Sequence, residues 1–268
     1  MKHYKKTHQP QEDYFSVPLW EKFEKEGLFH GFFKKKFSAQ GTKGAAQELG
    51  QAELANVAFA RGDSDEGVML HRQRVAAYAK GAECIFFTEQ AHTDRVRVVP
   101  SPPWEGPCDA LVTNCPHVLL GIYTADCVPV LLYDPVAKVI GAAHCGWKGL
   151  QQNLLTKTVE TMQTLGAHAA DIQGALGPCI HQEFYSVADD FCDNFPDDHD
   201  CFVKKEGLWF GDLPGIVKKQ GKKLGLACLS DLNIDTYEHP ELFFSYRRAL
   251  EAHQATTRSQ ASVIMMRA

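Results

Sequence analysis

An apolar run over residues 118–133, interrupted at Asp126 and Cys127, limits the folds open to this chain more than any other feature. The run is apolar at both odd and even positions, which is typical of strands covered on both faces. A turn is expected directly after it, and residues 138–143 predict a second strand that pairs back antiparallel. The hairpin places Cys127 and His144, which follows the returning strand, at the same end.

The rest of the chain predicts one α/β domain, because helical and strand-like segments alternate without a linker, repeat or low-complexity tract. The domain is expected over residues 26–268, after an N-terminal extension over residues 1–25. The further elements expected are a helix over 67–79, a strand over 85–88, a helix over 150–165, a strand over 172–176, a short helix over 184–191 and a helix capped by Asp212.

Composition places the chain among soluble globular proteins, with 44% hydrophobic and 23% charged residues. The net charge of −5 disfavours a surface for nucleic acid. Residues 1–15 lack the apolar core of a secretory signal, and residues 118–133 are too short and too interrupted to cross a membrane. Nine cysteines without paired spacings indicate free thiols. A cytoplasmic protein without nucleic-acid or membrane partners is expected. The sequence does not indicate an oligomeric state, and a monomer is plausible.

His92, Cys127 and His144 are the candidate metal ligands, because each lies at the end of a strand-like segment. Two imidazoles and one thiolate leave tetrahedral Zn²⁺ with one open position, as in catalytic sites. Such a centre carries a charge of about +1 and attracts anions. Two alternatives stay open: His92 alone is more often structural, and a thiolate beside an imidazole is also the nucleophile of cysteine hydrolases.

Five motifs occur in one order along the chain: EQAHTDRV, ADCVPVLLYD, AAHCGWKG, ALGPCI and FFSYRR. Together, over about residues 30–264, they resemble the laccase-domain family, whose members are known as multicopper polyphenol oxidases, zinc-dependent purine nucleoside phosphorylases or peptidoglycan editing factors. The resemblance implies a single-domain, mixed-sheet α/β sandwich of the cytotoxic necrotizing factor-like cysteine hydrolase type. It also implies a catalytic zinc site at His92, Cys127 and His144, with copper as the less favoured metal.

The resemblance implies chemistry on purine nucleosides and phosphate. The expected reactions are phosphorolysis of adenosine, inosine, guanosine or S-methyl-5′-thioadenosine, and deamination of adenosine. One alternative is hydrolysis of a wrongly built peptidoglycan precursor. Another is laccase-like oxidation of phenols, which needs more copper ions than three ligands can hold. A third is a regulator without catalytic activity, in which a structural zinc supports a partner surface.

Lys148, Tyr246 and Arg247 are the candidate contacts for substrate and phosphate near the centre. Lys148 stands where the family usually has arginine, and lysine lacks the planar two-pronged grip of arginine on phosphate. A weaker phosphate site, or a second phosphate-binding group, is therefore expected. Strand alternation predicts that Arg247 faces the pocket and that Arg248 points to the opposite face.

Residues of the N-terminal half are expected to form a further wall of the pocket. Asn56 is the candidate substrate contact there, and Arg61 is a second candidate. The family's glycine-rich segment is replaced here by KKKFSAQG, residues 34–41, which puts this wall in doubt. Near the C-terminus, Asp235 replaces a cysteine found in many members, and Arg258 stands one position from the usual glycine–arginine pair.

Overall fold

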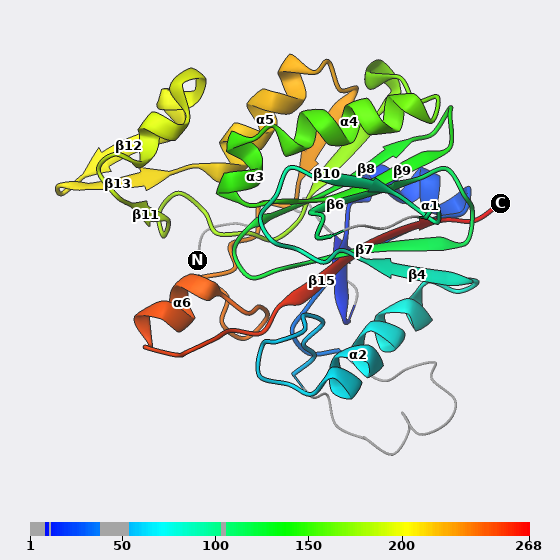
Figure 1. Cartoon of the computed structure of the whole chain (residues 1–268), viewed down its shortest axis with the longest axis horizontal. Coiled ribbons are helices and arrows are strands. Elements are labelled where there is room, and N and C mark those ends of the chain that lie inside the picture. Colours follow the sequence, from blue (N-terminus) through cyan, green and yellow to red (C-terminus); the bar gives the residue numbers. More distant parts are fainter. Residues whose placement is uncertain (1–8, 11, 38–53, 103–105) are drawn as a thin grey trace.

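The chain forms a four-layer α/β sandwich in which two six-stranded sheets lie face to face between helices (Figure 1). The computed structural model describes residues 9–10, 12–37, 54–102 and 106–268. Helices α4 (Leu154–Thr164) and α5 (Leu213–Lys223) cover one outer face, and α2 (Asp65–Tyr78) covers the other. The fold is thus a single mixed-sheet α/β domain, as the sequence predicts.

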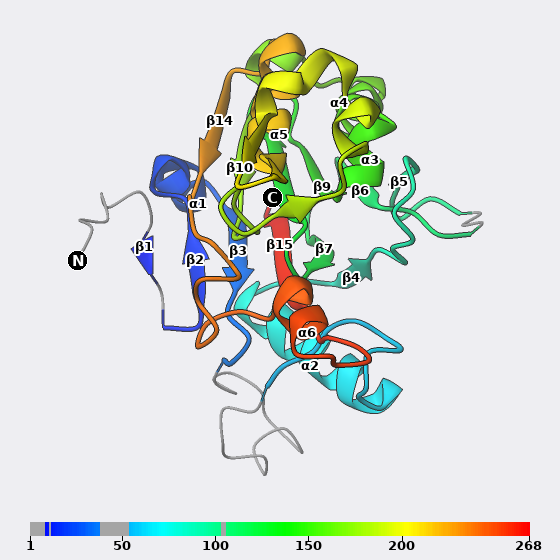
Figure 2. The same ribbon diagram turned by 90° about the vertical axis from the view of Figure 1, so that its left-hand side faces the viewer.

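The first sheet has its C-terminal strand in a central position, and Figure 2 shows β3, β15, β7 and β4 side by side. All its pairs are antiparallel except β7 with β4, which is parallel. In order across the sheet, the strands are β1 (Gln9–Pro10), β2 (Tyr14–Ser16), β3 (Leu28–Phe33), β15 (Gln260–Met266), β7 (Val118–Thr124) and β4 (Cys84–Phe87).

The second sheet is antiparallel at its centre and parallel at both edges. In order, its strands are β14 (Cys228–Asp231), β10 (Gln173–Leu176), β8 (Val128–Asp134), β9 (Val139–Cys145), β6 (Ala110–Thr113) and β5 (Val96–Val98).

A small third sheet and short helices complete the described part of the chain. The third sheet consists of β11 (Ser186–Val187), β13 (Leu208–Gly211) and β12 (Phe202–Lys205). The short helices are α1 (Glu21–Lys25), α3 (Trp147–Gln151) and α6 (Tyr246–Glu251), with 3₁₀ turns η1 (Pro18–Trp20), η3 (Ala169–Asp171), η4 (Phe191–Asn194) and η5 (Pro196–Cys201).

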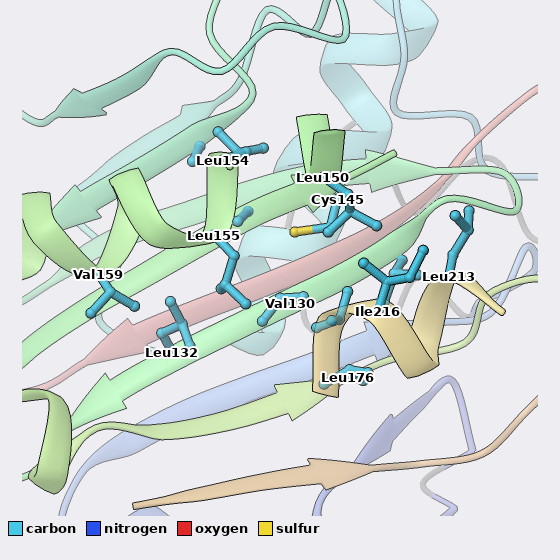
Figure 3. Close-up of a cluster of buried hydrophobic side chains, with 14 of the residues drawn as sticks. Val130, Leu132, Cys145, Leu150, Leu154, Leu155, Val159, Leu176, Leu213 and Ile216 are labelled. Carbon is cyan, nitrogen blue, oxygen red and sulfur yellow. The ribbon is translucent and has the colours of Figure 1, made fainter. Parts of the chain in front are cut away.

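Strand alternation divides the apolar side chains of the second sheet between two cores. Val130 and Leu132 of β8 face α4 and α5, where they meet Leu155 and Ile216 (Figure 3). The intervening Leu131 faces the first sheet. Both faces of the central strands are therefore buried, which explains why their sequence is apolar on both parities.

The hairpin predicted from residues 128–143 is confirmed. Strands β8 and β9 pair antiparallel from Val128 opposite Cys145 to Asp134 opposite Val139. The interruption before β8 is the point where the chain leaves β7 of the first sheet and enters the second. His144 and Cys145 alternate in β9, so Cys145 joins the core beneath α4 and α5 while His144 points the other way.

The segment set apart as an N-terminal extension contributes to the first sheet and to the core between the sheets. Strand β2 pairs with β3, and the side chains of Phe15, Trp20 and Phe23 are buried. Trp20 packs against His30 with 4.8 Å between ring centroids.

Two local predictions were wrong. The single helix expected over 150–165 is two helices, α3 and α4, because Asn153 between them adopts a left-handed conformation with φ of 61°. The helix expected over 184–191 does not form: β11 pairs with β13, and a 3₁₀ turn begins only at Phe191. The apolar spacing there reflects separate contacts rather than one helical face: Phe184 stacks on Tyr237, whereas Val187 and Phe191 pack against the core beneath α4 and α5.

None of the described helices combines the length and the hydropathy needed to span a membrane.

The close approach of the two sheets predicts a cost for a side chain at Gly177, which follows β10. A Cβ atom there would lie 2.0 Å from a ring carbon of Phe32 on β3, and Phe32 is fully buried. We expect Gly177→Ala to lower the free energy of unfolding by about 1–3 kcal/mol, measured by urea denaturation. Gly67→Ala in α2 is the matched control and should not destabilise, since no such clash exists there. Equal stability of the Gly177 variant and wild type would contradict this packing.

Candidate metal centre

The three predicted ligands come together at one end of the sandwich. His92 lies in the loop after β4, Cys127 at the crossing from β7 to β8, and His144 near the end of β9. Their ligand atoms all lie within 4.8 Å of one another, and 4.0 Å separates Cys127 Sγ from His92 Nε2. Among the described residues, this is the one group of three or more His, Cys, Asp or Glu side chains close enough to hold a metal.

A buried carboxylate, Asp109, organises the loop that carries His92. Asp109 directly precedes β6 and is fully buried. Its two oxygens accept the backbone N–H groups of residues 91–93 at 2.7–3.2 Å and the Thr93 hydroxyl at 2.8 Å. His92 has φ of 56°, a conformation that a non-glycine residue adopts only when its surroundings fix it. The hydrogen bonds to Asp109 provide that constraint.

The same carboxylate orients His144. Asp109 Oδ1 lies 2.8 Å from His144 Nδ1, and the backbone N–H of His144 donates to the Asp109 carbonyl at 2.8 Å. Nδ1 is therefore the protonated nitrogen, and Nε2 is left to face Cys127. A carboxylate behind a histidine ligand is the usual outer partner in zinc sites. Asp109 thus fixes two of the three ligands.

Charges within the centre favour an ionised thiol. Burial raises the pKa of Cys127, but His144 and His92 outweigh it and lower the value to about 6. Burial lowers the pKa of His144, whereas Cys127 and Asp109 raise it to about 9. Burial also opposes ionisation of Asp109, yet the hydrogen bonds from His144 and Thr93 keep its pKa below the usual value. The metal-free centre is therefore a thiolate–imidazolium pair at neutral pH.

The donor set fits zinc. Zn²⁺ is held by thiolate at about 2.3 Å and by imidazole at about 2.0–2.1 Å, which places tetrahedral ligand atoms about 3.5 Å apart. The ligand atoms, now within 4.8 Å of one another, thus need to approach by about 1.3 Å at most. Gly146 leaves room for this, because a Cβ there would lie 3.0 Å from His92 Cδ2 and 3.1 Å from Cys127 Sγ.

The centre opens into a cavity of about 490 Å³. It is large enough for a drug-sized ligand. Its lining residues are Arg61, Gln90, His92, Tyr123, Thr124, Ala125, Asp126, Cys127, His144, Trp147, Lys148, Ile180, Tyr185, Leu213, Tyr246, Arg247, Leu250, Thr257 and Ser259.

Lys148, Tyr246 and Arg247 all line this cavity, but Arg247 lies on a helix, whereas a strand was expected. Residues 246–251 form the helix α6 rather than a strand, because the Ser245 hydroxyl caps the helix by accepting the Arg248 N–H. Alternation along a strand therefore does not explain why the two arginines differ. Arg248 instead donates to backbone carbonyls of residues 236, 237 and 243.

Asp126 joins the metal centre to α6. This buried residue has φ of 92° and immediately precedes Cys127. Its carboxylate accepts the hydroxyl of Thr236 at 2.6 Å, the hydroxyl of Ser245 at 2.9 Å and the backbone N–H of Arg247 at 2.7 Å. The bend that presents Cys127 therefore also positions the start of α6 at the cavity.

Asn56 is fully buried and is not among the residues that line the cavity. Its side-chain amide hydrogen-bonds the backbone of Ala58 and Ser259. Asp235 accepts backbone N–H groups of residues 181 and 238, so it holds a turn. Of the KKKFSAQG segment, residues 38–41 lie outside the described part of the chain.

Sequence reasoning missed Asp109 and Asp126, which support the ligands without belonging to a ligand pattern. The available signal was an acid directly beside an apolar strand or inside an apolar run. A charged group in such a place is buried only if it is paired.

Residues 38–267 match the family described as multi-copper polyphenol oxidoreductase laccase, and the chain belongs to that family. It is 40% identical over 194 residues to a purine nucleoside phosphorylase of Deinococcus radiodurans. The matched stretch covers 70% of this chain and 74% of that relative. A purine nucleoside phosphorylase of Rickettsia conorii is 28% identical over 211 residues, covering 75% and 85%.

The fold is also that of solved structures. YlmD from Geobacillus stearothermophilus superposes with a TM-score of 0.80 at 24% identity, over 98% of this chain and 99% of that one. Neisseria meningitidis protein NMB0706 gives a TM-score of 0.74 at 25% identity, over 90% and 95%.

Asp109→Asn should weaken zinc binding by about tenfold to a hundredfold, because the neutral amide supports His144 and the His92 loop less well. Competition with a chromophoric chelator measures this affinity. The matched control is Asp94→Asn, which removes a charge from the same loop but from a side chain that pairs with Lys157. Wild-type zinc affinity in the Asp109 variant would contradict the assigned role.

Alkylation of metal-free protein should report the Cys127 thiolate. Because its folded pKa is about 6, the rate with iodoacetamide should fall as pH drops through about 6 and be near its plateau at pH 7. Peptide mass spectrometry follows the modified residue. His144→Ala removes the stabilising imidazolium and should move the midpoint upward. A wild-type midpoint near the ordinary thiol value of about 8.5 would refute the ion pair.

Proposed function

We propose that this chain is a zinc-dependent purine nucleoside phosphorylase. The observation that carries the proposal is a three-ligand centre opening into a cavity lined by cations and aromatic side chains. The names of the Deinococcus and Rickettsia relatives support a function of this type. We further propose that adenosine, inosine, guanosine and S-methyl-5′-thioadenosine are substrates, that adenosine is also deaminated, and that the enzyme works in the cytoplasm.

In this proposal, His92, Cys127 and His144 hold the metal, and the metal supplies Lewis acidity at one open position. Asp109 keeps His144 oriented with Nε2 toward the ligand site. Lys148 binds phosphate through charge. A phosphate oxygen forms a bond to the anomeric carbon of the ribose while the bond to the purine nitrogen breaks, and the purine leaves with that electron pair and takes up a proton.

The cavity walls suit a nucleoside. Trp147, Tyr185 and Tyr246 provide flat surfaces, and Leu213 and Leu250 provide apolar contact for a base. Arg247 is held by the Phe184 carbonyl and by the hydroxyl and carbonyl of Ser186. We propose that its remaining donors contact the substrate.

A second candidate is a metal-free cysteine hydrolase, which would suit the editing of a peptidoglycan precursor. The arrangement of Cys127, His144 and Asp109 favours this candidate. His144 interacts with the Cys127 thiol and is oriented by the Asp109 carboxylate, as nucleophile, base and carboxylate are linked in hydrolase triads. We do not propose phenol oxidation by several copper ions, because the described residues provide one cluster of three ligands.

Metal analysis with a nucleoside screen tests the function. We expect one zinc per chain, and release of purine base from nucleosides only when phosphate is present. Cys127→Ser should lose both zinc and phosphorolysis while remaining folded. Prolonged chelation should abolish turnover. No phosphate-dependent base release from any nucleoside would refute the phosphorylase, and turnover that survives chelation with a covalent adduct on Cys127 would establish the hydrolase.

A further inference from the structure

Two cations in the cavity have no internal partner. Arg61 and Lys148 both line it, and neither side chain forms a hydrogen bond or ion pair with any described residue. Lys148 lies 5.5 Å from the ring centroid of its neighbour Trp147. In a chain with a net charge of −5, two unpaired cations beside a metal centre form a local excess of positive charge.

The one carboxylate in the described lining of the cavity is already engaged by other groups. Asp126 is the one acidic residue among its described lining, and hydrogen bonds to Thr236, Ser245 and Arg247 already occupy its oxygens. An anion from solution is the partner that this arrangement lacks.

The loop that carries Arg61 is fixed at two points to the segment just before β15. Asn56 Oδ1 accepts the backbone N–H of Ser259 at 3.1 Å. Asp63 accepts two hydrogen bonds from the Arg258 guanidinium, at 2.7 and 2.8 Å. The loop is thus held while the Arg61 side chain is left for another partner.

Tyr123 places Arg61 near the His92 loop. The Tyr123 hydroxyl interacts electrostatically with Arg61 and accepts the backbone N–H of Gln90 at 3.3 Å. Gln90 lies two residues before His92. Arg61 therefore lies on the side of the cavity that the His92 loop borders.

Arg247 is less suited to be the principal anion contact. Two of its three guanidinium nitrogens donate to the 184–186 segment, at 2.6–3.0 Å, and its carbon lies 5.5 Å from the Tyr185 ring centroid. Two parallel donors for one phosphate are thus not free in Arg247, whereas all donors of Arg61 are.

We propose that Arg61, together with Lys148, binds inorganic phosphate in this cavity, and that Asn56 and Asp63 position Arg61. The identity of the anion rests on the proposed phosphorylase function. Arg61 supplies the planar guanidinium that Lys148 lacks. It is a binding residue for the co-substrate, whereas Asn56, Asp63 and Arg258 act through it.

Calorimetric titration of the zinc-loaded full chain with inorganic phosphate tests the proposal without relying on turnover. Arg61→Ala and Lys148→Ala should each raise the Kd for phosphate by about tenfold to a hundredfold, the loss expected for one charge-assisted contact. Arg61→Lys should lie between wild type and Arg61→Ala. Lys222→Ala, which removes a charge from an exposed position on α5, is the matched control and should bind as wild type.

Asp63→Asn should also weaken phosphate binding, by a smaller factor than Arg61→Ala, with zinc content unchanged. In kinetics, the KM for phosphate should rise in the Arg61 variant while the KM for the nucleoside changes little. An unchanged Kd for inorganic phosphate in Arg61→Ala would overturn the proposal. The same conclusion would follow if this variant bound a nucleoside 5′-monophosphate more weakly but inorganic phosphate as tightly as wild type. Phosphate binding that depends on Arg61 in a protein without phosphorolysis would support the anion site and refute the phosphorylase.

Discussion

The buried carboxylate of Asp109 is the interaction on which the metal centre depends. Burying an ionised carboxylate costs several kcal/mol unless donors replace its water. Here three backbone N–H groups, one hydroxyl and one imidazole do so. These donors belong to the loop of His92 and to His144, so the groups that stabilise the charge are the ones whose placement matters. The hydrogen bonds that stabilise the buried carboxylate therefore also fix the positions of His92 and His144.

The third ligand is placed by the crossing between the two sheets. Asp126 absorbs the sharp change of direction in a left-handed conformation, and its carboxylate joins that bend to the start of α6. Cys127, the cavity wall and the helix that carries Tyr246 are thus built from one junction. A change at this junction is expected to affect metal binding and the cavity together, whereas changes on the outer helices affect the core alone.

The sequence was sufficient to predict the hairpin and the grouping of His92, Cys127 and His144. The apolar run of residues 118–133 and its turn fix the register of β8 and β9, which sets Cys127 near His144. Residues that act through long-range contacts were not predictable in this way. Asp109 meets His144 across 35 positions, and Arg258 meets Asp63 across 195. The helical state of residues 246–251 was missed because its cap, Ser245, is recognised only once Asp126 orders the turn.

The alternation of β9 also decides what kind of metal site this chain can build. Two thiols lie within reach by sequence, Cys127 and Cys145, but the strand directs Cys145 into the apolar core, where burial raises its pKa far above the ordinary value. A shift of one residue would turn Cys145 toward the metal in place of His144. With His144 directed inward and Cys145 excluded, the second cysteine cannot close the coordination sphere. An open coordination position on a bound metal would therefore be a consequence of strand register.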